Sequence, residues 1–234
     1  MPRCYPFVLI LISAYMLYRL LAVAVFASSV MAQQRPALNT SQVLDQVDRK
    51  FSRMQDLSAD FTQISREPLN QTARASGHLY LMKGGKMRFE YEEPFKRVSV
   101  SDSKRFTDLN YANREATTDK VKDTIDERLP IMFLLGRSNL KNEFGKWKGT
   151  LDDQTGFVAI QLFPKKKGDV QWVEISVDPR TYLIHRLALK YSDESESEFF
   201  FDKIQTNIGL RSSLFDPTVP PGFHVVAIDD SGGR

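Results

Sequence analysis

The chain has one cysteine and three histidines in 234 residues, and this scarcity excludes several kinds of chemistry. The single thiol, Cys4, cannot build a disulfide framework or a cysteine-ligated zinc site. The histidines, His78, His185 and His224, are isolated, and no two have the spacing of metal ligands. The sequence also lacks a Gly-x-Ser-x-Gly nucleophile elbow, a His-Glu-x-x-His motif and a phosphate-binding glycine loop. We therefore expect no enzyme activity, no metal and no cofactor.

The sequence also lacks a large excess of charge of one sign. It has 32 basic and 29 acidic residues, which gives a formal net charge of +3. A nucleic-acid-binding protein is usually far more basic, so we expect no nucleic-acid partner. Glycine and proline are few, and 42% of the residues are hydrophobic. These values exclude collagen-like and disordered chains, and the length allows a core without disulfides.

One long apolar stretch covers residues 7–31, but Arg19 interrupts it. The part that follows Arg19 has the order of a secretory signal. A basic residue precedes the apolar run Leu20–Phe26, and small residues follow, with Val30 and Ala32 at the positions that signal peptidase recognises. The pattern predicts cleavage after Ala32.

We therefore predict that residues 1–32 are a cleaved secretory signal peptide and that residues 33–234 form a single exported domain. Met16 is an alternative start, and an uncleaved anchor is the alternative to cleavage. Removal of residues 1–32 takes away Arg3, Arg19 and Cys4, and it leaves 30 basic and 29 acidic residues. The exported chain would then be nearly neutral and free of cysteine.

An amphipathic pattern begins at Thr40. Apolar residues recur at helical spacing while charged residues fill the other face, and the apolar set is Val43, Leu44, Val47, Phe51 and Met54. Thr40 or Ser41 can serve as the N-cap. The pattern predicts a helix of about four turns. Its apolar side either packs on a core or covers a ligand-binding surface.

After Leu57 apolar and polar residues alternate through most of the remaining chain. The clearest hairpin places Lys83-Gly84-Gly85-Lys86 between the runs Gly77–Met82 and Met87–Tyr91, because primed turns favour glycine. Further runs are Phe157–Phe163, Gln171–Val177, Leu183–Tyr191 and Phe199–Ile204. About eleven strands joined by short turns predict an antiparallel sheet that is strongly curled or closed.

A second helix is predicted at Leu129–Gly136, which has Pro130 at its start and glycine at its end. It is apolar on all sides and must be buried, inside the curled sheet or across its mouth. Several strands are also apolar on both faces, so protein covers both faces or part of the concave face is reserved for an apolar ligand. The charge runs Lys165–Lys167 and Asp193–Glu198 are predicted to be solvated surface, and the second would discourage aggregation at a sheet edge.

Several segments in order resemble the LolA family of periplasmic carriers for outer-membrane lipoproteins. They are Ser58–Gln63, Gly77–Leu81, Met87–Pro94, Val98–Asp102, Pro130–Gly136, Leu214-Phe215 and Pro221-Gly222. Their order and spacing match from about Gln42 to Val226. The resemblance implies a mainly β fold with some α structure, an unclosed antiparallel β-barrel whose helices form a lid over an apolar cavity.

The resemblance also implies a function. The cavity would take the acyl chains of outer-membrane lipoproteins in the periplasm, received from an inner-membrane ABC transporter and passed to an outer-membrane receptor by a monomeric carrier. The residues implied to line the lid and cavity are Phe61, Leu79, Leu81, Met87, Phe89, Tyr91, Met132, Leu134 and Leu135.

Family members commonly have Arg-Pro where this chain has Lys83-Gly84, and the resemblance implies that this arginine latches the lid by hydrogen bonds to the helix backbone. Lys83 and Arg88 are therefore the implied latch residues. Three other readings stay open. They are a lipid- or protein-binding sensor domain that does not ferry cargo, a receptor-type relative, which would need a lipidated cysteine where Gln33 stands, and an enzyme acting on lipids.

Overall fold

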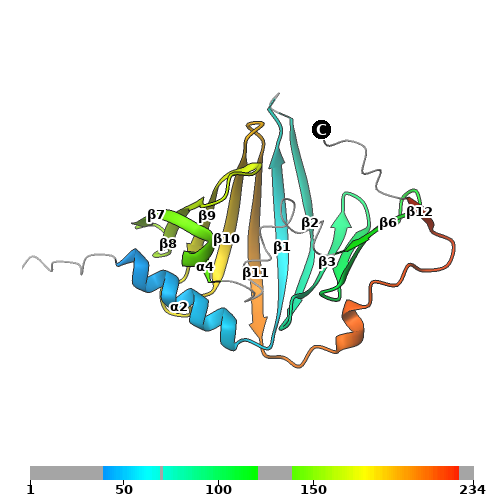
Figure 1. Cartoon of the computed structure of the whole chain (residues 1–234), viewed down its shortest axis with the longest axis horizontal. Coiled ribbons are helices and arrows are strands. Elements are labelled where there is room, and N and C mark those ends of the chain that lie inside the picture. Colours follow the sequence, from blue (N-terminus) through cyan, green and yellow to red (C-terminus); the bar gives the residue numbers. More distant parts are fainter. Residues whose placement is uncertain (1–38, 69–70, 121–138, 227–234) are drawn as a thin grey trace, which may run out of the picture. The chain divides into compact units, whose positions relative to one another are not determined.

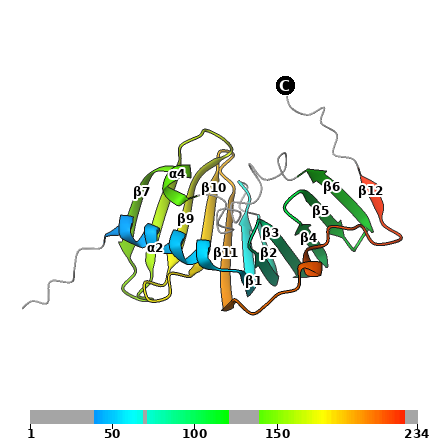
Figure 2. The same cartoon turned by 60° about the horizontal axis from the view of Figure 1, so that its bottom comes forward.

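The computed structural model describes residues 39–68, 71–120 and 139–226, and most of them form one sheet of twelve strands. The order across the sheet is β12-β6-β5-β4-β3-β2-β1-β11-β10-β9-β8-β7. The edge strands β12 and β7 do not pair with each other, so the barrel is unclosed, as Figures 1 and 2 show. The strands are β1 (Asp56–Arg66), β2 (Thr72–Met82), β3 (Lys86–Glu93), β4 (Arg97–Ser101), β5 (Arg105–Asn110), β6 (Glu115–Lys120), β7 (Phe144–Leu151), β8 (Val158–Pro164), β9 (Val170–Val177), β10 (Ile184–Tyr191), β11 (Glu196–Thr206) and β12 (His224–Val226).

The predicted fold class is confirmed, with two refinements. The sheet has twelve strands rather than about eleven, and the short strand β12 pairs with β6 in parallel, whereas the other neighbours are antiparallel. The sequence pattern did not indicate β12, because three residues are too few to show an alternation. Among the described residues, no helix is long and apolar enough to cross a membrane.

The predicted first helix is α2 (Thr40–Arg53), which lies across one face of β7–β11 (Figure 2). Its N-cap is Asn39, whose side chain accepts a hydrogen bond from the Gln42 N–H at 3.1 Å, so the predicted cap at Thr40 or Ser41 is wrong by one or two residues. Thr40 instead packs on β7, where a Cβ added at Gly149 would lie 2.2 Å from its Oγ1. The glycine therefore allows the helix to approach the sheet closely.

Two shorter helical elements complete the described chain. These are the single turn α4 (Leu140–Glu143), which lies beside α2, and the 3₁₀ turn η2 (Ser212–Phe215), which follows β11. The predicted second helix at Leu129–Gly136 lies outside the described residues.

The predicted β2–β3 hairpin is confirmed, and its turn contains Gly84 and Gly85 at φ values of 90° and 84°. These positive values require the glycines. Further along the hairpin the two strands come very close together at Gly77. A Cβ there would lie 1.8 Å from the carbonyl oxygen of Glu90 on β3, and the pairing register shifts between Ser76 and Gly77.

The sheet has an apolar interior on each face. The larger core lies on the face that α2 covers, where Leu44, Val47 and Phe51 of the helix meet side chains from β1–β3 and β7–β11. The smaller core lies on the opposite face of β4–β6. It contains Val98, Val100, Leu109 and Ala116, with Tyr111, Val219 and Phe223 packed against them.

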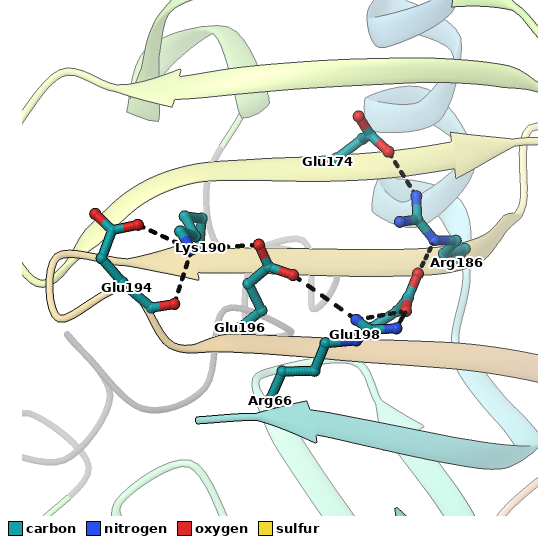
Figure 3. A network of polar contacts seen from close by, with 7 residues as sticks. All are labelled: Arg66, Glu174, Arg186, Lys190, Glu194, Glu196 and Glu198. Carbon is teal, nitrogen blue, oxygen red and sulfur yellow. Dashed lines mark hydrogen bonds and ion pairs between the residues drawn. The ribbon is translucent and has the colours of Figure 1, made fainter. Parts of the chain in front are cut away.

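The outer face of β1 and β9–β11 carries a network of charged side chains (Figure 3). Glu198 accepts hydrogen bonds from Arg66 at 3.1 Å and from Arg186, and Arg186 also donates to Glu174 at 2.5 Å. Glu198 is only 7% exposed, so the prediction that Asp193–Glu198 is solvated surface is wrong at its C-terminal end. Since β11 lies between β1 and β10, this run also protects no sheet edge. The lysine run 165–167 is exposed, as predicted.

Candidate ligand-binding face

Five aromatic rings form a cluster on the α2 side of the sheet. Alternate residues of a strand point to one face, and the register sets Phe61 of β1 beside Phe201 of β11. The ring centroids of Phe61 and Phe89 are 5.4 Å apart, and those of Phe61 and Tyr91 are 5.0 Å apart, both edge-to-face. Phe199 packs against Phe89 at 6.2 Å. The result is a continuous apolar surface across β11, β1 and β3.

The structure brings together six of the nine predicted lining residues on this surface. Leu79, Leu81 and Met87 extend the cluster along β2 and β3 and are each at most 2% exposed. Phe61 and Phe89 are buried and Tyr91 is half-buried. Their part in binding a ligand stays a prediction. The remaining predicted residues, Met132, Leu134 and Leu135, lie outside the described residues.

Tyr91 marks the boundary between the apolar cluster and a polar strip. Its hydroxyl donates to Gln63 Oε1 at 3.1 Å, and burial raises the pKa of Tyr91 to about 12, so the hydroxyl remains a donor at neutral pH. Gln63 Nε2 in turn donates to Ser197 Oγ at 3.0 Å and to Ser65 Oγ at 3.3 Å. Sequence reasoning missed these polar residues, since each looks like an ordinary exposed position of its strand.

A groove of about 350 Å³ lies beyond Tyr91. Arg97 is held at its wall because its Nε donates to both carboxylate oxygens of Asp108, at 2.8 and 2.9 Å. Phe95 stands at the rim with 68% of its surface exposed. The groove is lined by Gln63, Ser65, Ala73, Arg74, Ala75, Tyr91, Glu93, Pro94, Phe95, Arg97 and Asn110. An amphiphile could enter with its apolar chain toward the aromatic cluster and its polar end among these side chains.

The helix α2, which lies on the same side of the sheet, is tied to α4 by two acidic side chains. Asp48 Oδ1 accepts a hydrogen bond from the Leu140 N–H at 3.1 Å, and Asp45 Oδ1 pairs with Lys141 Nζ at 2.5 Å. The second oxygen of Asp48 is buried without a hydrogen-bond partner among the described residues, and burial raises the pKa of Asp48. The sequence placed both carboxylates on the polar side of the helix, but nothing in it indicated partners about 92 residues away.

The two predicted latch residues lie in different places. The Lys83 backbone N–H donates at 2.8 Å to the carbonyl of Gln55, which lies just beyond the end of α2, and the side chain is exposed. Arg88 points to the opposite face from Met87 and donates to Glu90 at 2.6 Å and to the Leu214 carbonyl at 3.3 Å. Neighbouring residues of a strand point to opposite faces of the sheet. Arg88 therefore contacts η2, on the face opposite to α2. The latch role of Lys83 stays a prediction.

The described residues hold no group of three His, Cys, Asp or Glu that could bind a metal ion. His78 is isolated in sequence but lies between two carboxylates in space. Its Nδ1 is 2.7 Å from Asp60 Oδ1 and its Nε2 is 3.5 Å from Glu92 Oε1. Asp60 is also paired with Lys203 Nζ at 2.7 Å, which makes this an ion-pair cluster on the outer face.

An unclosed barrel with a helix across an apolar, aromatic-lined face and a groove at its edge defines a class of binding protein. The chain belongs to the LolA family. The family model described as "Outer membrane lipoprotein carrier protein LolA" matches residues 52–218.

Individual relatives agree with this assignment. An outer-membrane lipoprotein carrier protein of Bordetella avium is 25% identical over 214 residues, covering 91% of this chain and 98% of the relative. One of Methylococcus capsulatus is 25% identical over 174 residues, covering 72% and 80%. A solved structure of an uncharacterized conserved protein from Thermus thermophilus superposes with a TM-score of 0.50 at 12% identity, covering 82% of this chain and 100% of that one. The last likeness bears on the fold alone.

Proposed function

We propose that this protein carries outer-membrane lipoproteins through the periplasm by burying their acyl chains on the aromatic face, on the α2 side of the sheet. The observation that carries the proposal is the continuity of that face with an open groove, since Tyr91 belongs to both. Family membership and the names of the relatives support it. The expected partners are an inner-membrane ABC transporter that supplies the cargo and an outer-membrane receptor that accepts it. The cleaved signal peptide of residues 1–32 and a monomeric state belong to the same proposal.

The energetics of acyl-chain burial require an incomplete enclosure. Burial contributes about 0.8 kcal/mol per CH₂, so a chain of roughly 14 methylenes would contribute about 11 kcal/mol. Three such chains, fully buried, would exceed the practical limit of about 18 to 21 kcal/mol for non-covalent binding. A groove that is open along one side limits this burial and lets a receptor with higher affinity take the cargo.

In this proposal α2 moves away from α4 when cargo is loaded or released. The helix is held to α4 through Asp48–Leu140 and Asp45–Lys141. The second oxygen of Asp48 is buried without a hydrogen-bond partner among the described residues, so exposing it to water would offset part of the free energy that opposes this movement.

The test is a transfer assay. The protein, purified from the periplasm of expressing cells, is mixed with inner-membrane vesicles that contain labelled lipoprotein and a competent transporter. We expect labelled lipoprotein to leave the vesicles in a soluble one-to-one complex. Retention in the vesicles, under conditions in which an established family carrier extracts the same lipoprotein, would refute the carrier function and favour the sensor alternative.

A matched pair of variants tests the groove. Phe95→Ala removes an exposed ring at the rim, so it should weaken binding of an apolar fluorescent probe severalfold without changing the unfolding midpoint. Ile208→Ala is the control, because Ile208 is a 47% exposed apolar residue that is not part of the groove lining. Equal probe binding by the two variants would exclude the groove as the entry.

The latch prediction has its own variant. Lys83→Arg restores the planar guanidinium that the family commonly has at this position, and its fork can donate to two helix carbonyls at once. If Lys83 latches the lid, the variant should close it more tightly and change the rate of probe binding. An unchanged rate would remove Lys83 from the lid mechanism.

A further inference from the structure

Five lysines and one aromatic ring gather at the β7 edge of the sheet. We call this set the edge-lysine patch, and its members are Lys146, Lys148, Phe163, Lys165, Lys166 and Lys167. The lysines at 146, 148 and 165–167 are exposed, and Phe163 is 37% exposed.

The strand register brings the members of the patch together. Lys146 of β7 is the direct partner of Phe163 of β8, so both side chains emerge on the same outer face. Lys148 lies two residues further along β7 and points the same way. Lys165 follows β8 and packs on the start of β7, where its Cγ would lie 3.1 Å from a Cβ at Gly145. Residues 166 and 167 continue into the adjoining turn.

The charge of the patch is not compensated. Within the described part of the chain none of the five lysines forms an ion pair, and the polar contact found for this group is Lys165 Nζ donating to the Lys141 carbonyl at 2.9 Å. The outer face of β9–β11 is different. There Lys190 pairs with Glu194 and Glu196, and Arg186 pairs with Glu174 and Glu198 (Figure 3). The positive charge at the β7 edge therefore lacks the acidic partners that neutralise the basic side chains of β9–β11.

We propose that the edge-lysine patch docks the protein on an anionic lipid surface. Lysine presents a compact charge on a flexible stem, without the planar fork that selects one shaped anion, and this suits a layer of many mobile headgroups. An exposed aromatic ring among the lysines suits the interface between headgroups and acyl chains. This inference rests on the proposed function, because a carrier that loads at a membrane gains from being held at its surface.

The experiment measures co-sedimentation with vesicles of phosphatidylcholine alone and of phosphatidylcholine mixed with phosphatidylglycerol. We expect binding to the anionic vesicles only, and we expect it to weaken as salt is added. Each lysine close to an anionic bilayer strengthens binding by about fivefold, so Lys165→Gln, Lys166→Gln and Lys167→Gln combined should weaken it by about a hundredfold. Glutamine at position 165 keeps the Cγ atom that lies against Gly145, so the fold should be retained.

The control is a triple variant with the same change of charge at exposed sites elsewhere, Lys104→Gln, Arg114→Gln and Arg211→Gln. It should bind anionic vesicles nearly as the parent protein does. Equal loss in both triple variants, or equal binding to neutral vesicles, would overturn the proposal. The proposal would also be overturned if the patch variant bound anionic vesicles normally but failed to take lipoprotein from the transporter. That result would mean that the patch binds an acidic protein surface.

A further readout separates this inference from the carrier function. The patch variant should bind an apolar probe as the parent protein does, since no patch residue lines the aromatic face or the groove. A protein that docks on anionic vesicles but never extracts lipoprotein would refute the carrier function alone. A protein that extracts lipoprotein but ignores anionic vesicles would refute the docking surface alone.

Discussion

The two apolar cores of the sheet are closed in different ways. The small core on β4–β6 is covered by the chain that follows η2. Thr107 Oγ1 donates to the Pro217 carbonyl at 2.7 Å, Phe223 packs edge-to-face on Tyr111 at 5.1 Å, and β12 adds backbone pairing with β6. The covering segment therefore depends on the sheet for its own hydrogen bonds.

The large core is covered by α2, which satisfies its backbone hydrogen bonds internally. Its polar ties to the rest of the chain include two side-chain contacts with α4, through Asp45 and Asp48. Half-buried rings such as Tyr91 and Trp147 surround the core. The two covers are therefore held differently. The segment after η2 is held by backbone pairing of β12 with β6, whereas α2 is held by its buried apolar side chains and by the contacts of Asp45 and Asp48 with α4.

The largest expected effect comes from removing a ring of the large core. Phe89→Ala should lower the free energy of unfolding by about 3 to 5 kcal/mol, because Phe89 is 1% exposed and lies in the centre of the aromatic cluster. Leu109→Ala, in the small core, should cost about 2 to 3 kcal/mol, because a small cluster collapses more readily into the space. Urea unfolding measures both. A larger loss of unfolding free energy for Leu109→Ala than for Phe89→Ala would show that the small core contributes more to stability than the large one.

The second-largest effect is expected at Gly77, where β2 and β3 of the large core come very close together. Gly77→Ala should lower the free energy of unfolding by about 1 to 3 kcal/mol, because its Cβ would strike the Glu90 carbonyl and the strands must separate. Separation would also shift Leu79 and Phe89 in the aromatic face, so probe binding should fall as well.

Gly168→Ala is the matched control for this substitution. A Cβ at Gly168 meets nothing within 4 Å, and its backbone is outside the left-handed region. Stability should change by less than about 0.5 kcal/mol, or rise slightly through the stiffer unfolded chain. An equal loss in both glycine variants would mean that the close approach at Gly77 has no energetic consequence.

The sequence predicted the repeating elements of the fold well, because they have regular periods. The 3.6-residue pattern of residues 43–54 identified α2, and the Gly84-Gly85 pair identified the turn of the β2–β3 hairpin. These features depend on local residues, so a single sequence contains the information.

The features that the sequence missed depend on partners far apart along the chain. Glu198 belongs to a run that looks solvated, and only the pairing of β11 with β1 and β10 buries it beside Arg66 and Arg186. Arg88 was paired with Lys83 in the latch, but the alternation of β3 turns it toward Leu214. The groove likewise requires β1–β5 to be brought together, which no single motif specifies.

A smaller effect tests how the small core is sealed. Thr107 is fully buried, and Thr107→Val keeps its shape but removes the hydrogen bond to the Pro217 carbonyl. The free energy of unfolding should fall by about 1 to 2 kcal/mol. Probe binding on the α2 face should stay the same, because the two cores lie on opposite faces. Thr107→Ser keeps the hydroxyl and should lose less free energy of unfolding. A change in probe binding by Thr107→Val would show that the two cores are coupled.

The smallest effect concerns acid stability at Asp60, which forms its ion pairs on the outer face of the sheet. On the outer face, the hydrogen bond from Lys203 and then the one from His78 hold the pKa of Asp60 below its ordinary value of 3.8. A lowered folded pKa means that the folded state binds its proton less readily than the unfolded chain. The stabilisation is therefore complete above pH 3.8 and is lost as the pH falls through the lower folded pKa. Asp60→Asn should flatten the fall of the urea midpoint between about pH 5 and pH 2.5. In a protein that also carries Lys203→Met, Asp60→Asn should change the pH dependence of the urea midpoint much less. An equal change in both proteins would show that Lys203 is not the group that lowers the pKa of Asp60.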